Sequence, residues 1–180
     1  NDYETVIGEN VKNEKWTSVL FSVSLMHQKP DALIRWMTRM ALDGFDSRAA
    51  LLAHRCWQES QEPIREVLRP DIINGLVGGL GDLQSGLATE ARLRKHLISL
   101  GDIATDKIVE LINDFNGLQQ RLLPEWKGRR HPDVNTEAGH RIYSGYKARY
   151  NLIDVLGDIA SLLQEKGIRA FQANNEALSV

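Results

Sequence analysis

The basic and aromatic residues between positions 125 and 150 are the side chains of this sequence best suited to bind a partner. Six Lys and Arg residues lie here against three Asp and Glu residues, which leaves a charge of +3 in a chain whose net charge is −2. Trp and Tyr side chains are interleaved with the charges. The candidate partner- or anion-binding residues are Trp126, Lys127, Arg129, Arg130, Arg141, Tyr143, Tyr146, Lys147, Arg149 and Tyr150.

Three uses of this segment stay open from the sequence. Exposed Trp, Tyr and Arg are the residues that dominate protein interfaces, which favours a protein partner. Cations that meet phosphates and tyrosines that stack on bases would instead bind single-stranded RNA or DNA. In the third use, Tyr143, Tyr146 and Tyr150 share one helical face, at i, i+3 and i+7, and pack on the protein's own core while the charges face water.

One pair of residues resembles a catalytic arrangement. All-α ribonucleases of the HEPN type use an arginine and a histidine four to six residues apart on a helix, and Arg48 and His54 have that spacing. A chain of this composition is expected to contain roughly one such pair by chance. The sequence therefore keeps a HEPN-like ribonuclease as a third hypothesis and otherwise predicts His54 to be a partly buried residue beside Trp57.

Other signatures of catalysis or of metal binding are missing from the sequence. Cys56 is the single cysteine, and no two histidines have the close spacing of zinc ligands. The glycines between 75 and 86 resemble a phosphate-binding loop in composition alone, because no lysine lies between Lys29 and Lys95. We therefore predict no catalytic residue, no metal and no cofactor, and expect Cys56 to be a small buried hydrophobe.

Helix signals divide the chain into the elements that must position these residues. Apolar residues recur at helical spacing, and no hairpin turn separates alternating runs. Asp46 and Asp102 stand at predicted N-caps, and Gly101 at the position after a helix end. Helices are predicted over 11–28, 30–43, 47–58, a short piece between Pro63 and Pro70, 71–87 as one close-packed helix or two half-helices, 89–100, 102–123 and 140–165.

The fold class that follows is all-α. We predict a single-domain bundle of about six to eight helices with one long polar loop at about 124–139. Loops of this length inside a compact domain are more often functional than simple connectors. The expected organisation is a flexible segment at 1–10, a helical domain at 11–167 that ends at Gly167, and a C-terminal tail at 168–180.

The composition of the chain indicates a globular protein without a membrane span. The chain has 180 residues, 42% of them hydrophobic and 26% charged, which suits one globular domain. No run approaches the roughly 18 apolar residues of a membrane span, so no membrane partner is expected. A single cysteine favours a reducing compartment, and we expect a cytoplasmic protein.

The leading hypothesis is a non-enzymatic helical protein-interaction or regulatory module. A homo-oligomer is one form that this module can take. Its partner surface is expected around residues 125–150. The alternative is a nucleic-acid-binding protein that uses the same segment on single-stranded RNA or DNA.

Overall fold

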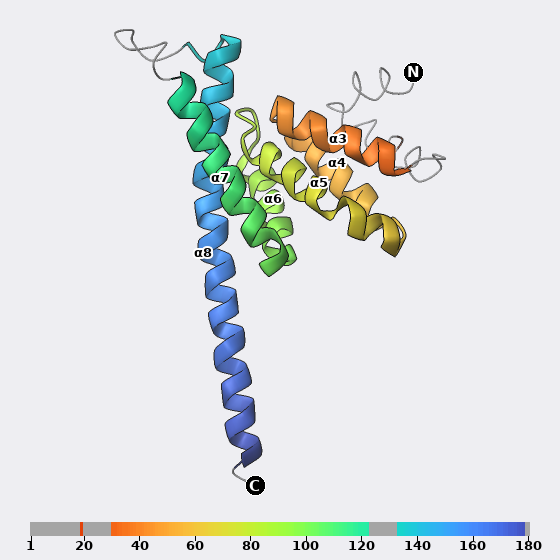
Figure 1. Cartoon of the computed structure of the whole chain (residues 1–180), viewed down its shortest axis with the longest axis vertical. Helices are drawn as coiled ribbons and strands as arrows, with labels where there is room; N and C mark the ends of the chain where they lie inside the picture. The colour runs from red at the N-terminus through yellow and green to blue at the C-terminus, as the bar shows by residue number, and fades with distance from the viewer. Residues whose placement is uncertain (1–18, 20–29, 123–132, 179–180) are drawn as a thin grey trace.

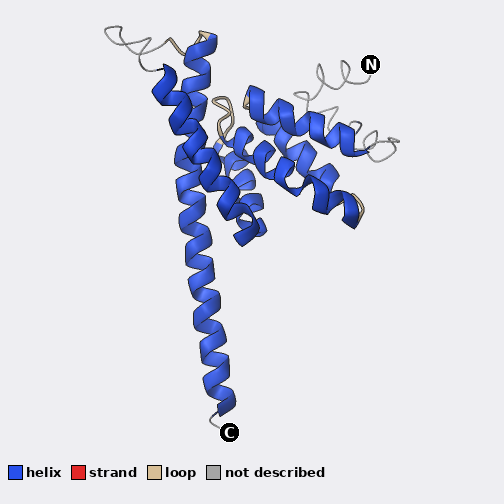
Figure 2. Cartoon of the chain, viewed as in Figure 1, coloured by secondary structure: helices blue, strands red, loops and turns tan. Residues whose placement is uncertain are grey.

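The computed structural model describes Val19 and residues 30–122 and 133–178, and the described residues form helices without any strand (Figures 1 and 2). This confirms the predicted all-α bundle. The six helices are α3 (Pro30–Gly44), α4 (Ser47–Gln58), α5 (Glu62–Leu80), α6 (Leu87–Leu100), α7 (Asp102–Leu122) and α8 (Glu137–Leu178).

The helices form a compact group beside one long helix. α3 and α4 both pack on α5, while α7 lies along α8. α6 contacts α4, α5, α7 and α8, and α5 also contacts α7 and α8, so both helices join the two parts of the bundle. In Figure 1 the C-terminal end of α8 extends beyond every other helix.

Helix α5 supplies the centre of the core. From Ile72 to Leu80 every residue except Asn74 is buried. The glycines in this run allow close contact, because a Cβ on Gly78 would lie 2.7 Å from the carbonyl carbon of Ala41 and closer still to that carbonyl's oxygen. The glycine-rich run is therefore a close-packed helix as far as Leu80, and a turn at 81–86 follows it.

The predicted helix ends are confirmed at three places. The Asp46 carboxylate accepts hydrogen bonds from the backbone N–H groups of Arg48 and Ala49, both at 3.0 Å, and thereby caps α4. α4 covers the predicted 47–58. Gly101, with φ of 55°, ends α6 in a conformation that favours glycine.

Cys56 is 2% exposed, as expected for a buried hydrophobe.

Several predicted helix boundaries are wrong. The helix expected over 71–87 ends at Leu80, and α8 begins at Glu137, inside the loop expected to reach 139. Pro70 lies inside α5 and does not separate two helices. The proline removes one helical hydrogen bond, but the buried residues that follow hold the helix together. Gly167 does not end α8, which begins at Glu137 and continues to Leu178. A glycine weakens a helix by about 1 kcal/mol and ends it only with a capping conformation.

Several predictions fall on residues outside the described part of the chain. These are the segment at 1–10, all of the helix at 11–28 except Val19, and residues 124–132 of the long loop. The division into a domain at 11–167 and a tail at 168–180 stays a prediction. Among the described residues, no helix is both long and apolar enough to cross a membrane.

Candidate functional site

The predicted binding segment lies partly on α8. Arg141, Tyr143, Tyr146, Lys147, Arg149 and Tyr150 all belong to this helix. Trp126, Lys127, Arg129 and Arg130 lie outside the described residues. Arg141 is exposed, and Arg149 is half-buried.

The tyrosines on α8 differ in exposure although their spacing places them on one helical face. Tyr143 and Tyr146 are half-buried, whereas 68% of Tyr150 is exposed. The same face continues with Ile153, which is 47% exposed, and then with Gly157 and Ala160, which are also exposed. The opposite side of the helix is buried at Leu152, Val155 and Ile159. The part of this face from Tyr150 onward is therefore available to a partner.

Lys147 points into the protein, where it holds three elements together. Its Nζ lies 2.6 Å from the Glu90 carboxylate at the start of α6. The same ammonium donates hydrogen bonds to the carbonyl of Asp82 at 2.6 Å and to the hydroxyl of Ser85 at 3.1 Å. The side chain of Lys147 is 23% exposed, and it stabilises the contact between α8, α6 and the turn at 81–86.

Removing the charge of Lys147 is therefore expected to lower stability. For Lys147→Met we expect the free energy of unfolding to fall by about 1–3 kcal/mol, because the half-buried Glu90 loses its partner. Urea unfolding followed by circular dichroism measures the change. Arg141→Met, at an exposed position on the same helix, is the control, and we expect a change within about 0.5 kcal/mol. An equal effect of both variants would contradict the assignment.

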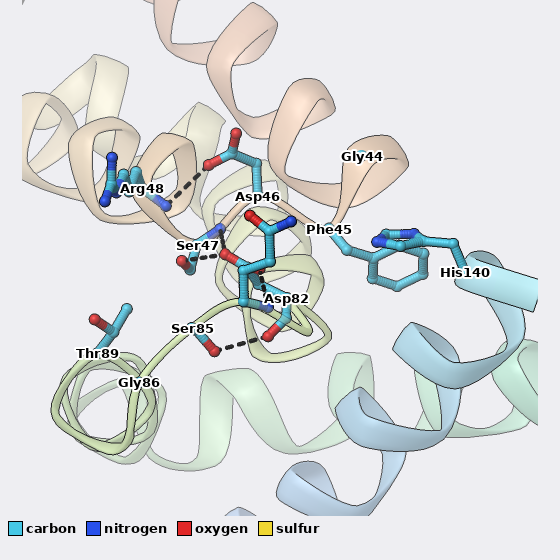
Figure 3. Close-up of a pocket in the computed structure, with 11 residues that line it drawn as sticks. Gly44, Phe45, Asp46, Ser47, Arg48, Asp82, Ser85, Gly86, Thr89 and His140 are labelled. Carbon is cyan, nitrogen blue, oxygen red and sulfur yellow. Dashed lines mark hydrogen bonds between the residues drawn. The ribbon is translucent and has the colours of Figure 1, made fainter. Parts of the chain in front are cut away.

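Asp82 is the centre of a hydrogen-bond network next to Lys147 (Figure 3). Its Oδ2 accepts from the hydroxyl of Ser47 at 2.5 Å and from the backbone N–H of Ser47 at 3.2 Å. Its Oδ1 accepts from the backbone N–H of Gln84 at 2.9 Å. One carboxylate thus joins the first turn of α4 to the turn that precedes α6.

This network forms the wall of a polar pocket of about 390 Å³. Figure 3 shows its lining, which comes from the end of α3, from α4, α6 and α8, and from the turns before α4 and α6. A Ser-His-Asp triad needs the histidine between the serine and the aspartate. Here Ser47 donates directly to Asp82, and His140 lines the pocket from α8. The arrangement suits holding the helices together rather than activating a nucleophile.

Arg48 and His54 both lie on α4 but differ in exposure. Arg48 is exposed at the polar pocket, whereas His54 is 2% exposed. A separation of six residues places two side chains about 120° apart around a helix. As predicted, His54 lies beside Trp57, with 5.6 Å between the ring centroids, but it is fully rather than partly buried.

Sequence reasoning missed the contact between His54 and His96, whose ring centroids are 4.0 Å apart. It also missed that Asp154 and Asp158 both accept from Arg94 of α6, each at 3.2 Å. No local pattern signals these contacts, because each joins residues more than 40 positions apart. In the part of the chain that the structure describes, no group of three or more His, Cys, Asp or Glu side chains could hold a metal ion.

Comparison with known proteins adds no family to this description. No family model, curated protein or solved structure matches the chain.

Proposed function

We propose that this protein is a non-enzymatic helical interaction module of the cytoplasm that binds a protein partner through α8. The observation that carries the proposal is the exposed apolar face that begins at Tyr150 and Ile153, which are 68% and 47% exposed. Aromatic residues at the centre of an interface often dominate the binding energy. The proposed partner surface includes the preceding segment from Trp126 to Arg130.

The surroundings of this face support the proposal. Gly157 and Ala160 lie one and two turns further along α8 and are exposed, and a Cβ on Gly157 would meet no atom within 4 Å. A partner's backbone could therefore approach closely beside the two large side chains. Arg149, half-buried on the adjacent turn, adds a charged group of the kind that interfaces favour.

Comparative affinity capture tests the proposal. Tagged wild-type protein and the variants Tyr150→Ala and Ile153→Asp are used to capture partners from a nuclease-treated lysate. Loss of a central interface side chain weakens binding by about 2 kcal/mol, so we expect roughly thirty-fold less of the captured protein with each variant. Val67→Asp is the matched control, because Val67 is 63% exposed but lies on α5.

The outcomes separate the proposal from its alternative. Wild-type capture that neither α8 variant reduces would contradict a partner surface on this face. Capture from an untreated lysate that is lost from the nuclease-treated lysate would instead favour nucleic-acid binding. Circular dichroism of each variant confirms that a loss of capture does not come from unfolding.

A further inference from the structure

Two histidines from different helices form a contact inside the bundle. The rings of His54 on α4 and His96 on α6 have centroids 4.0 Å apart, with their planes tilted by 36°. His54 is 2% exposed, and His96 is half-buried. Neutral imidazoles can pack in this way, but a proton on either ring places a positive charge in a poorly solvated position.

The surroundings of the pair oppose protonation. Burial, and secondarily the His96 imidazole, lowers the pKa of His54 from 6.5 to about 4. Burial first, then the Arg92 guanidinium and the Lys95 ammonium, lowers the pKa of His96. Both of these cations belong to α6, and all of the named causes act in the same direction.

In the described part of the chain, no carboxylate is among the groups that shift the pKa of either histidine. On α4, the neighbour of His54 is the Trp57 ring. Across that ring, α5 contributes the carbonyl of Arg65, which accepts the indole N–H of Trp57 at 2.8 Å. That carbonyl is therefore engaged with Trp57. The positive charge of an imidazolium would face the cations of α6.

Helix α6 buries fewer residues than α4 or α5. Its buried residues are Leu93 and Leu97, whereas α5 buries nine residues and α4 eight. The N-cap of α6 is Gly86, which has no side chain to cap the helix. A helix with few buried apolar contacts opens at a lower free energy than the core around it.

We propose that the His54–His96 contact is an acid-sensitive joint, which releases α6 from α4 on protonation while α3, α4 and α5 stay packed. Release would expose Leu93 and Leu97. It would also separate the ion pairs that tie α6 to α8, at Glu90–Lys147 and at Arg94–Asp154. The joint thereby couples pH to the contact between α6 and α8.

The direction of the pH dependence follows from linkage. The pKa of His54 is lower in the packed state than in the open state, so proton binding favours opening. The joint is fully stabilising above about pH 6.5, and its contribution is lost as the pH falls toward 4. If His54 alone returns to its ordinary pKa on release, the equilibrium constant for release of α6 rises about 30-fold as the pH falls from 7.5 to 5.

Hydrogen exchange of the full chain at pH 7.5 and pH 5 tests the joint, with each rate corrected for intrinsic exchange. We expect amides of α6 to lose about 30-fold in protection between the two pH values, through an opening of lower free energy and smaller urea dependence than the global unfolding that exposes amides of α3. In the variant His54→Phe/His96→Phe the loss in α6 should shrink to less than about 3-fold, because neither ring titrates. His140→Gln, a histidine substitution on α8, is the control and should keep the wild-type loss.

Three results would overturn the proposal. One is exchange of α6 at pH 5 with the same free energy of opening and the same urea dependence as α3, which would mean that acid unfolds the whole bundle. Another is an unchanged acid response in the double variant. If that variant does not fold, NMR of the histidine side chains in the wild-type protein decides. Protonation of His54 while the amides of α6 remain protected from hydrogen exchange would contradict the proposed joint.

Discussion

Replacing Gly78 with alanine is expected to lower the free energy of unfolding by about 3 kcal/mol or more. A Cβ at this position would lie 2.7 Å from the carbonyl carbon of Ala41 and nearer still to the Ala41 oxygen and the Cα of Leu42. These are backbone atoms of α3, which cannot rotate away as a flexible side chain can. α3 would have to move off α5, and the core that both helices share would loosen.

Urea unfolding of Gly78→Ala measures this effect, and Gly157→Ala provides the matched control. Gly157 lies on the exposed side of α8, where an added Cβ meets no atom within 4 Å. Because alanine favours the helix more than glycine does, we expect the control to gain up to about 1 kcal/mol. Similar stability of the two variants would show that α3 and α5 are not in backbone contact at Gly78.

Replacing Asp82 with alanine has the second largest expected effect, a loss of about 2–4 kcal/mol in the free energy of unfolding. The substitution leaves the hydroxyl and the backbone N–H of Ser47, both buried, without the carboxylate that accepts from them. It also removes the acceptor for the backbone N–H of Gln84. The turn before α6 would no longer be tied to α4.

A double-mutant cycle separates the contribution of the Ser47–Asp82 contact from the rest of the network. Ser47→Ala, Asp82→Ala and the double variant are compared by urea unfolding. We expect a coupling energy of about 1–2 kcal/mol, because each single substitution breaks the same hydrogen bond. Additive effects would contradict the role assigned to this contact.

The sequence was sufficient to predict the features that local chemistry determines. Asp46 caps α4, and Gly101 ends α6 with a positive φ, as their types and positions indicated. Helical spacing of apolar residues gave the fold class because one face of each helix must be buried. The glycine-rich run around Gly78 could be interpreted as a helix, and it is one as far as Leu80.

What the sequence could not provide depends on contacts between distant residues. Pro70 is tolerated within α5 because the surrounding core favours a continuous helix, an effect that no local signal reveals. Lys147 was assigned to a partner surface, but its ammonium meets Glu90, 57 positions earlier in the chain. Whether a lysine on a helix faces solvent or a buried carboxylate depends on the packing of another helix.

Native mass spectrometry of gently purified protein tests the central claim, a protein partner on the exposed face of α8, most directly. The wild-type chain of 20.3 kDa should carry additional protein mass, from a different partner or from a second copy. The variant Tyr150→Ala/Ile153→Asp should return to 20.3 kDa under the same conditions. Identical spectra for the two proteins, whether both bare or both carrying the same added mass, would contradict the account.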